Sequence, residues 1–105
     1  VAHGIGNAFY ERLVFDDNGQ LLTASFMDYL LPTALDMPHI DTAHLETPSP
    51  LNPLGVKGAG EAGAIPGGAL FAQAIENALA IPELEILEMP LDPARLFHLI
   101  RSARG

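Results

Sequence analysis

The sequence predicts an α+β fold, an antiparallel or mixed sheet with helices packed on one side. Three observations lead to this prediction: a strong hairpin-turn motif at residues 16–19, segments in which apolar and polar residues alternate, and an apolar stripe at helical spacing in residues 66–80. Consecutive strands joined by a hairpin favour antiparallel pairing, and separate helices then cover the sheet. The length of 105 residues predicts a single domain, residues 1–105.

The first segment, residues 1–13, is predicted to be a helix because Ile5 and Phe9 share one face at helical spacing. Gly4 and Gly6 lower the helix propensity of this segment. Glycine at these positions therefore suggests that another backbone or a ligand approaches closely.

Strands are predicted in three further places. Residues 16–19 read Asp-Asp-Asn-Gly, a hairpin turn, and residues 21–29 follow as the return strand. A third strand is expected over residues 39–47, where the side chains alternate, and another over residues 84–89.

Two helices are predicted in the second half of the chain. Residues 66–80 carry the clearest apolar stripe, and Pro66 is acceptable in a first helical turn. Asp92 and Pro93 combine an N-cap with a first-turn proline, which predicts a last helix running through Arg104.

The composition excludes several functions. Five basic against 13 acidic residues give a net charge of −8, which argues against nucleic acid or an anionic membrane as a partner. Without cysteine there is no disulfide framework and no thiol nucleophile. No apolar run approaches the length of a membrane span and no signal-peptide pattern is present, so we expect a cytoplasmic location.

The chain is also apolar for a small domain, with 49% hydrophobic and 17% charged residues. Some of its surface is therefore expected to meet another protein or domain. Exposed apolar patches seek partners, so the isolated chain is expected to self-associate.

The glycine-rich loop over residues 53–66 is the most informative motif. Glycines allow a backbone to approach a ligand closely, and the start of the next helix favours an anion. Glu61 would repel an anion, but it makes sense as a general base whose position the glycines set. Lys57 could hold an anionic ligand or pair with Glu61. The structural alternative is a turn with an acid near a helix start and a solvated lysine.

Residues 58–63 also match the dinucleotide fingerprint G-x-G-x-x-G. That fingerprint is meaningful only after a strand and inside a βαβ unit. Three prolines in residues 47–53 do not form a buried strand. A small nucleotide-binding domain is therefore the weaker alternative.

The histidines show no metal-ligand spacing, so no metal site of protein ligands is expected. They are His3, His39, His44 and His98.

Several motifs in order along the chain resemble one known family. The matching segments are residues 1–11, 16–22, 25–29, 44–50 and 55–63, and the last of these reads Gly-Val-Lys-Gly-Ala-Gly-Glu-Ala-Gly. Through these segments the chain is similar to the C-terminal end of the large, molybdenum-binding subunit of the xanthine dehydrogenase and aldehyde oxidase family, in particular its carbon-monoxide-dehydrogenase-type branch.

The resemblance implies a role for the glycine-rich loop. Glu61 matches the family's active-site glutamate, a general base that takes a proton from a hydroxyl on the molybdenum. The cofactor-binding positions implied by the match are Gly4, Lys57, Gly58, Ala59 and Gly60. His3 stands where many relatives carry glutamine, which leaves its contact with the cofactor open.

The resemblance also implies partners and a reaction. In the family the cofactor is molybdenum-molybdopterin, here expected in its cytosine dinucleotide form, and partner subunits carry FAD and 2Fe-2S clusters. The substrate would be a small aldehyde, N-heterocycle or carbon monoxide. The family's large subunit is several times longer, so this chain needs the remainder of that subunit. Alone it is expected to bind no cofactor and to be inactive. The alternative is an interaction domain that kept the fold and lost the chemistry.

Overall fold

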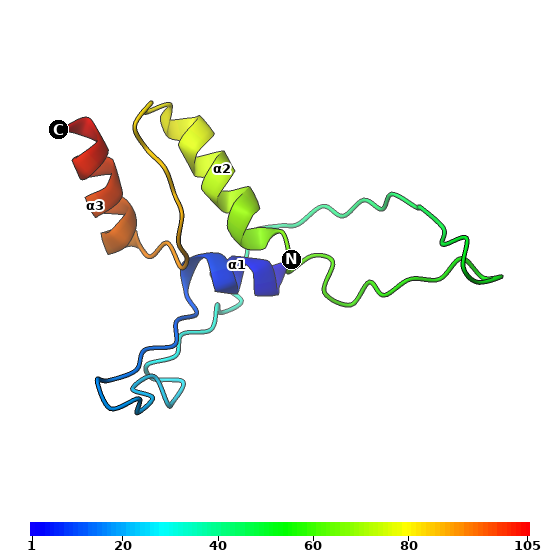
Figure 1. Cartoon of the computed structure of the whole chain (residues 1–105), viewed down its shortest axis with the longest axis horizontal. Coiled ribbons are helices and arrows are strands. Elements are labelled where there is room, and N and C mark those ends of the chain that lie inside the picture. The colour runs from blue at the N-terminus through cyan, green and yellow to red at the C-terminus, as the bar shows by residue number, and fades with distance from the viewer.

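A computed structural model describes all of residues 1–105, and its regular secondary structure is entirely helical (Figure 1). The only β-type pairing is an isolated antiparallel bridge between Phe15 and Leu21. The α+β prediction is therefore wrong, because no sheet forms. The three helices are α1 (Ala2–Phe9), α2 (Gly67–Leu79) and α3 (Pro93–Arg104).

The predicted helices all form, with ends set by local hydrogen bonds. Helix α1 stops at Phe9 rather than at residue 13, because the amides of Tyr10 and Glu11 both donate to the carbonyl of Gly6. Helix α2 ends where Ala80 adopts a left-handed conformation with φ of 49°.

The predicted N-cap of α3 is confirmed. The Asp92 carboxylate accepts a hydrogen bond of 2.9 Å from the amide of Arg95, which satisfies one of the unpaired donors of the first turn.

The hairpin turn forms, but its flanks do not extend into strands. Asp16 accepts hydrogen bonds from the amides of Asn18 and Gln20, and Gly19 takes a positive φ of 80°. The return segment is then interrupted by a second turn, in which the amide of Tyr29 donates to the carbonyl of Ser25 at 2.8 Å. This turn prevents residues 21–29 from continuing as a strand.

The two other predicted strands are extended segments without a strand beside them. No backbone–backbone hydrogen bond involves residues 39–47. In residues 84–89 the amide of Ile86 donates to the carboxylate of Glu76 on α2 at 2.6 Å, so a helix side chain replaces the neighbouring strand. The strands predicted from the sequence alternation are therefore wrong, because a strand requires a hydrogen-bonding partner that these segments do not have.

The core lies where residues 80–92 pass between α2 and α3 (Figure 1). Its four buried residues are Ala72, Leu84, Ile86 and Leu91, and α3 packs Leu96 and Leu99 against them. Helix α1 is joined to this core because the amide of Leu91 donates to the carbonyl of Ala8 at 2.7 Å.

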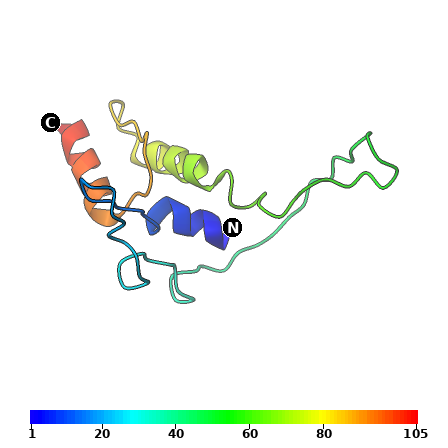
Figure 2. The same ribbon diagram turned by 60° about the horizontal axis from the view of Figure 1, so that its bottom comes forward.

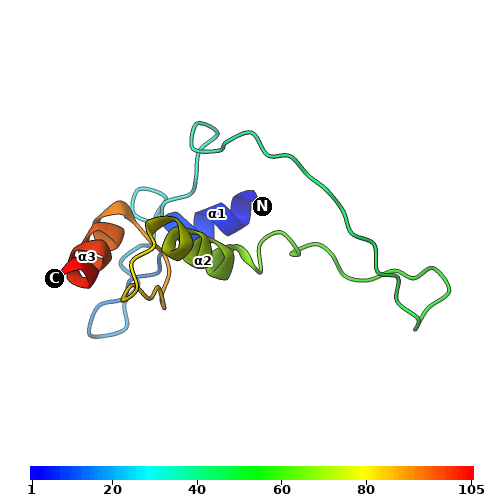
Figure 3. The ribbon, with the colours of Figure 1, turned by 90° about the horizontal axis from the view of Figure 1, so that it is seen from above.

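The rest of the chain is open. Nine of 105 residues are buried, and the radius of gyration is 17.5 Å, against about 13 Å for a compact chain of this length. Residues 39–65, here called the arm, project away from the helices in every view (Figures 1, 2 and 3). No helix has both the length and the apolar character that crossing a membrane requires. Large apolar side chains on the arm are exposed: Leu45, Leu51, Leu54, Val56 and Ile65.

Candidate functional site

The far end of the arm, residues 47–57, is a closed turn that we call the tip. Its backbone is joined by hydrogen bonds from the amide of Ser49 to the carbonyl of Gly55 (3.0 Å) and from the amide of Gly55 to the carbonyl of Asn52 (3.1 Å). Gly55 has a φ of +67°, and a Cβ added there would lie 2.8 Å from the Cβ of Pro48. Both facts require glycine at this position.

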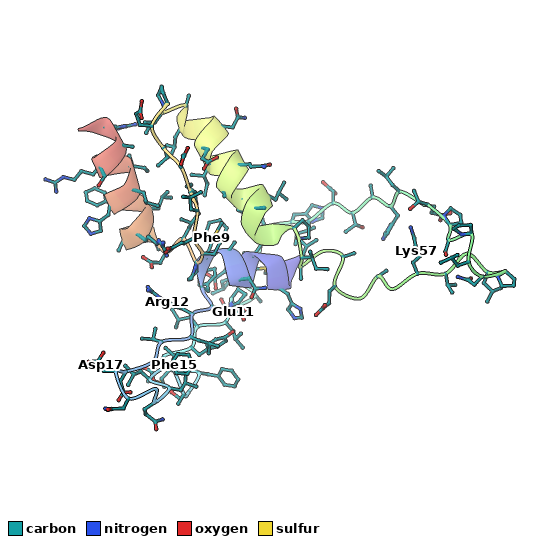
Figure 4. All side chains as sticks on the ribbon, viewed as in Figure 1. Phe9, Glu11, Arg12, Phe15, Asp17 and Lys57 are labelled. Atoms are coloured by element: carbon teal, nitrogen blue, oxygen red, sulfur yellow. The ribbon has the colours of Figure 1, made fainter.

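Two side chains complete the tip. Asn52 pairs with both backbone groups of Val56: its Oδ1 accepts from the amide at 3.0 Å and its Nδ2 donates to the carbonyl at 2.9 Å. Lys57 Nζ donates to Thr47 Oγ1 at 2.6 Å, and its side chain lies between the two legs of the arm (Figure 4). No ion pair joins Lys57 to Glu61, because the ion pairs of the chain are His39–Asp41 and Arg95–Glu88.

The backbone after the tip is open. A Cβ added at Gly58 or Gly60 would meet no atom within 4 Å. The amides of residues 58–61 donate to no group of the protein. This is the surface that a ligand can approach closely and to which it can present acceptor atoms.

Glu61 lies at the end of this open segment. Its carboxylate is exposed and accepts no hydrogen bond, so it is available to take a proton from a neighbouring group. Its carbonyl accepts from the amides of Ala64 (2.9 Å) and Ile65 (3.0 Å), which starts the turn that leads into α2.

Gly4 is placed elsewhere than on the open backbone. A Cβ at Gly4 would lie 3.0 Å from the carbonyl oxygen of Gly63, and a Cβ at Gly67 would lie 2.7 Å from the Cα of Gly4. Gly4 therefore lets α1 pack directly on the residues that follow Glu61. His3 is exposed on α1 and makes no hydrogen bond or ion pair.

These residues fit an anionic cofactor through their backbone. The glycines leave room for close approach, and the unpaired amides of residues 58–61 are neutral donors. The only cation of the loop, Lys57, is turned toward Thr47. The G-x-G-x-x-G match loses its dinucleotide meaning, because the tip that precedes it is a turn and not a strand.

Sequence reasoning missed Thr47 and Asn52. The signal for Asn52 was present in the Asn-Pro pair at residues 52–53, which favours a turn. Thr47 carries no such signal, because its partner Lys57 lies ten residues away.

A second polar cluster lies at the end of α1, away from the arm. Tyr29 donates to the carboxylate of Glu11 at 2.5 Å, and this hydrogen bond raises the pKa of Tyr29. Hydrogen bonds from the side chain and amide of Thr33, both 2.7 Å, lower the pKa of Asp36. The bond between Tyr29 and Glu11 joins this segment to the residues that follow α1.

The chain is similar to known proteins over most of its length. Residues 1–38 match the family model described as molybdopterin cofactor-binding domain. The chain is 45% identical over 95 residues to the 6-hydroxypseudooxynicotine dehydrogenase complex subunit gamma of Paenarthrobacter nicotinovorans, covering 90% of this chain and 12% of that protein. It is 39% identical over 92 residues to the carbon monoxide dehydrogenase large chain of Afipia carboxidovorans, covering 88% of this chain and 11% of that protein.

Solved structures give the same result. Quinoline 2-oxidoreductase from Pseudomonas putida 86 superimposes with a TM-score of 0.82 and 47% identity, covering 95% of this chain and 13% of that chain. The Cu,Mo-CO dehydrogenase gives a TM-score of 0.80 at 34% identity, covering 98% and 14%. The chain belongs to the xanthine dehydrogenase and aldehyde oxidase family. It is similar to part of a molybdenum-binding large subunit and spans about an eighth of the length of these relatives.

The structural match explains the open shape of the chain. A TM-score of 0.82 covering 95% of this chain means that its backbone follows a path similar to that of part of a solved enzyme. Residues 39–47 belong to this matched backbone although they make no backbone–backbone hydrogen bond within this chain.

Proposed function

We propose that this chain is the part of a molybdenum hydroxylase large subunit that supplies the active-site general base, Glu61. The observation that carries this proposal is the pairing of an unbonded, exposed carboxylate with the open backbone of residues 58–61. A carboxylate used only to start a helix would be expected to bond a first-turn amide, and Glu61 bonds none.

The residues of the loop would have two roles, contact with the cofactor and acceptance of a proton. Gly58, Ala59 and Gly60 would lie along the cofactor, with their amides donating to its acceptor atoms. When bound, the molybdenum cofactor would supply two-electron redox chemistry with water-derived oxygen. Glu61 would accept the proton released as the substrate carbon is hydroxylated, acting at its carboxylate oxygens.

The substrate class and partners follow from the relatives. We propose a small electrophilic substrate, namely an aldehyde, an N-heterocycle or carbon monoxide, because the similar proteins bear the names of nicotine-compound, quinoline and carbon monoxide enzymes. The cytosine dinucleotide form of the cofactor, partner subunits with FAD and 2Fe-2S clusters, and a cytoplasmic location are parts of the same proposal.

The remainder of the large subunit would cover the exposed apolar surface of this chain. Seventeen large apolar side chains are exposed, among them Leu35 and Leu45, each 99% accessible. Such a surface is unfavourable in water at about 25 cal/mol per Å². Self-association of the isolated chain remains a prediction from the same surface.

The test uses the full-length subunit assembled with its partner subunits. Glu61→Gln keeps the shape of the side chain but accepts no proton, so turnover should fall by about 10²–10⁴ while molybdenum and pterin contents stay normal. The matched control is Glu85→Gln, which removes the same charge from an exposed position remote from the arm. Turnover in Glu61→Gln equal to that of the control would support an interaction domain without chemistry.

A further inference from the structure

The tip fixes the chain on the N-terminal side of the glycine segment. The two hydrogen bonds of Asn52 to Val56 fix the direction in which the backbone leaves the tip. The bond from Lys57 to Thr47 then joins the two legs of the arm at the last residue before Gly58 (Figure 4). These bonds form although the tip packs against no other part of the chain (Figure 1).

The C-terminal side of the segment is fixed separately. The carbonyl of Glu61 accepts two amides of the following turn, and that turn packs on α1 through the contact of Gly4 with Gly63 and Gly67. Between these two hydrogen-bonded ends, the amides of residues 58–61 donate to no group, and the one backbone–backbone bond runs from the amide of Ala62 to the carbonyl of Ala59 at 3.3 Å.

We propose that Thr47, Asn52 and Lys57 are positioning residues that shorten the free backbone before Glu61 and so direct its carboxylate. The proposal rests on the proposed role of Glu61 as the base. Each residue released from the tip would add backbone conformations to the segment, and a base that spends less time in the productive orientation lowers the rate of proton transfer.

The role of Lys57 is the point at which this proposal differs from the family expectation. A lysine that served the negative charge of the cofactor would act through its ammonium, independently of Thr47. In the structure the ammonium donates to the Thr47 hydroxyl at 2.6 Å, so the two side chains form one unit. Removing either member should then have the same effect as removing both.

The experiment is a double-mutant cycle in the full-length holoenzyme. Thr47→Val removes the hydroxyl at nearly constant shape, and Lys57→Met removes the ammonium while keeping most of the stem. We expect each variant, and the double variant, to lower kcat by about 10-fold at little changed KM, less than the 10²-fold that a 1 Å misplacement can cost. Thr47→Ser keeps the hydroxyl and should therefore retain the wild-type turnover. The matched control is Thr42→Val, the same substitution at an exposed arm residue without a hydrogen bond.

Asn52 is tested in the same way with a graded pair. Asn52→Ala loses both bonds to Val56, whereas Asn52→Asp keeps the acceptor for the amide and loses the donor, so its kcat should lie between those of wild type and Asn52→Ala. The pH profile of kcat should keep its apparent pKa in every variant, because the base is unchanged.

Two readouts separate this proposal from the function on which it rests. Hydrogen exchange of the hydrogen-bonded tip amides, those of Ser49, Gly55 and Val56, should be faster in the Thr47, Asn52 and Lys57 variants whether or not Glu61 is the base. Exchange and kcat equal to those of Thr42→Val would overturn the proposal. So would a severe loss in Lys57→Met with none in Thr47→Val, since Lys57 would then act directly on the cofactor or on Glu61.

Discussion

The contact between α1 and α2 depends on Gly67, because any side chain at this position would collide with the backbone of α1. A Cβ added at Gly67 would lie 2.7 Å from the Cα, 2.9 Å from the carbonyl oxygen and 3.0 Å from the carbonyl carbon of Gly4. All three atoms belong to the main chain of α1, so no side chain can rotate away. We predict that Gly67→Ala separates the N-terminal parts of the two helices.

The size of the effect follows from these distances. An ordinary carbon contact begins at about 3.4 Å, so α1 must move by about 0.7 Å at the point of closest approach. Overpacking of this kind costs about 1–3 kcal/mol. Gly68→Ala is the matched control on the same helix, because its added Cβ would meet only the flexible Met89 side chain at 3.4 Å. Alanine there should be neutral or stabilising by up to about 1 kcal/mol.

The assay is hydrogen exchange of α1 and α2 in the full-length subunit, read peptide by peptide. A loss of 1–3 kcal/mol corresponds to exchange about 5- to 150-fold faster in Gly67→Ala, confined to these helices. Gly68→Ala should exchange at the wild-type rate or more slowly. Equal exchange in the two variants would refute the reasoning, because the contact between glycine backbones would then carry no specific constraint.

Two other predictions concern hydrogen bonds outside the arm. Asp92→Ala should destabilise the first turn of α3 by about 1 kcal/mol, seen as about 5-fold faster exchange there, because the amide of Arg95 loses its acceptor; Asp92→Asn, which keeps an acceptor, should resemble wild type. The raised pKa of Tyr29 means that its bond to Glu11 stabilises the fold fully below the unfolded phenol pKa of about 10, and that this contribution is lost as the pH rises through the higher folded value. Around the reference phenol pKa of about 10, from about pH 9 to about pH 11, the thermal midpoint of the full-length subunit should therefore fall more in wild type than in Tyr29→Phe. Parallel curves of thermal midpoint against pH would contradict the assignment.

Helices were predictable from the sequence because their signals are local. The N-cap at Asp92 and the apolar stripe of α2 depend on residues within four positions of one another. The end of α1 was not predictable, because it is set by the amides of Tyr10 and Glu11 meeting at one carbonyl rather than by a change in apolar spacing.

Strands were not predictable because a strand depends on hydrogen bonds to a second segment, and the local sequence does not show whether that segment exists. Residues 84–89 have the alternation of a strand and bury Leu84 and Ile86, yet the hydrogen-bonding neighbour is the side chain of Glu76. The alternation reports burial on one face and leaves the identity of the covering element open.

In the candidate site, too, the local features were predictable and the contacts between distant residues were not. The glycines and Glu61 were found from composition and from the resemblance to a family, because both lie in one short motif. The partner of Lys57 was not found, since a hydrogen bond to Thr47 across ten residues leaves no pattern in the sequence. Gly4 was identified as special, but its contact with Gly63 and Gly67 could be known only from the packing of α1.

The most direct test of the account is the rate at which substrate reduces the molybdenum centre of the assembled enzyme in a single anaerobic turnover. This step contains the proton transfer assigned to Glu61 and excludes later electron transfer to partner subunits. We predict that Glu61→Gln reduces at a rate about 10²–10⁴ below wild type, with metal and pterin contents unchanged. Reduction at the wild-type rate in Glu61→Gln would contradict the central claim that Glu61 is the base.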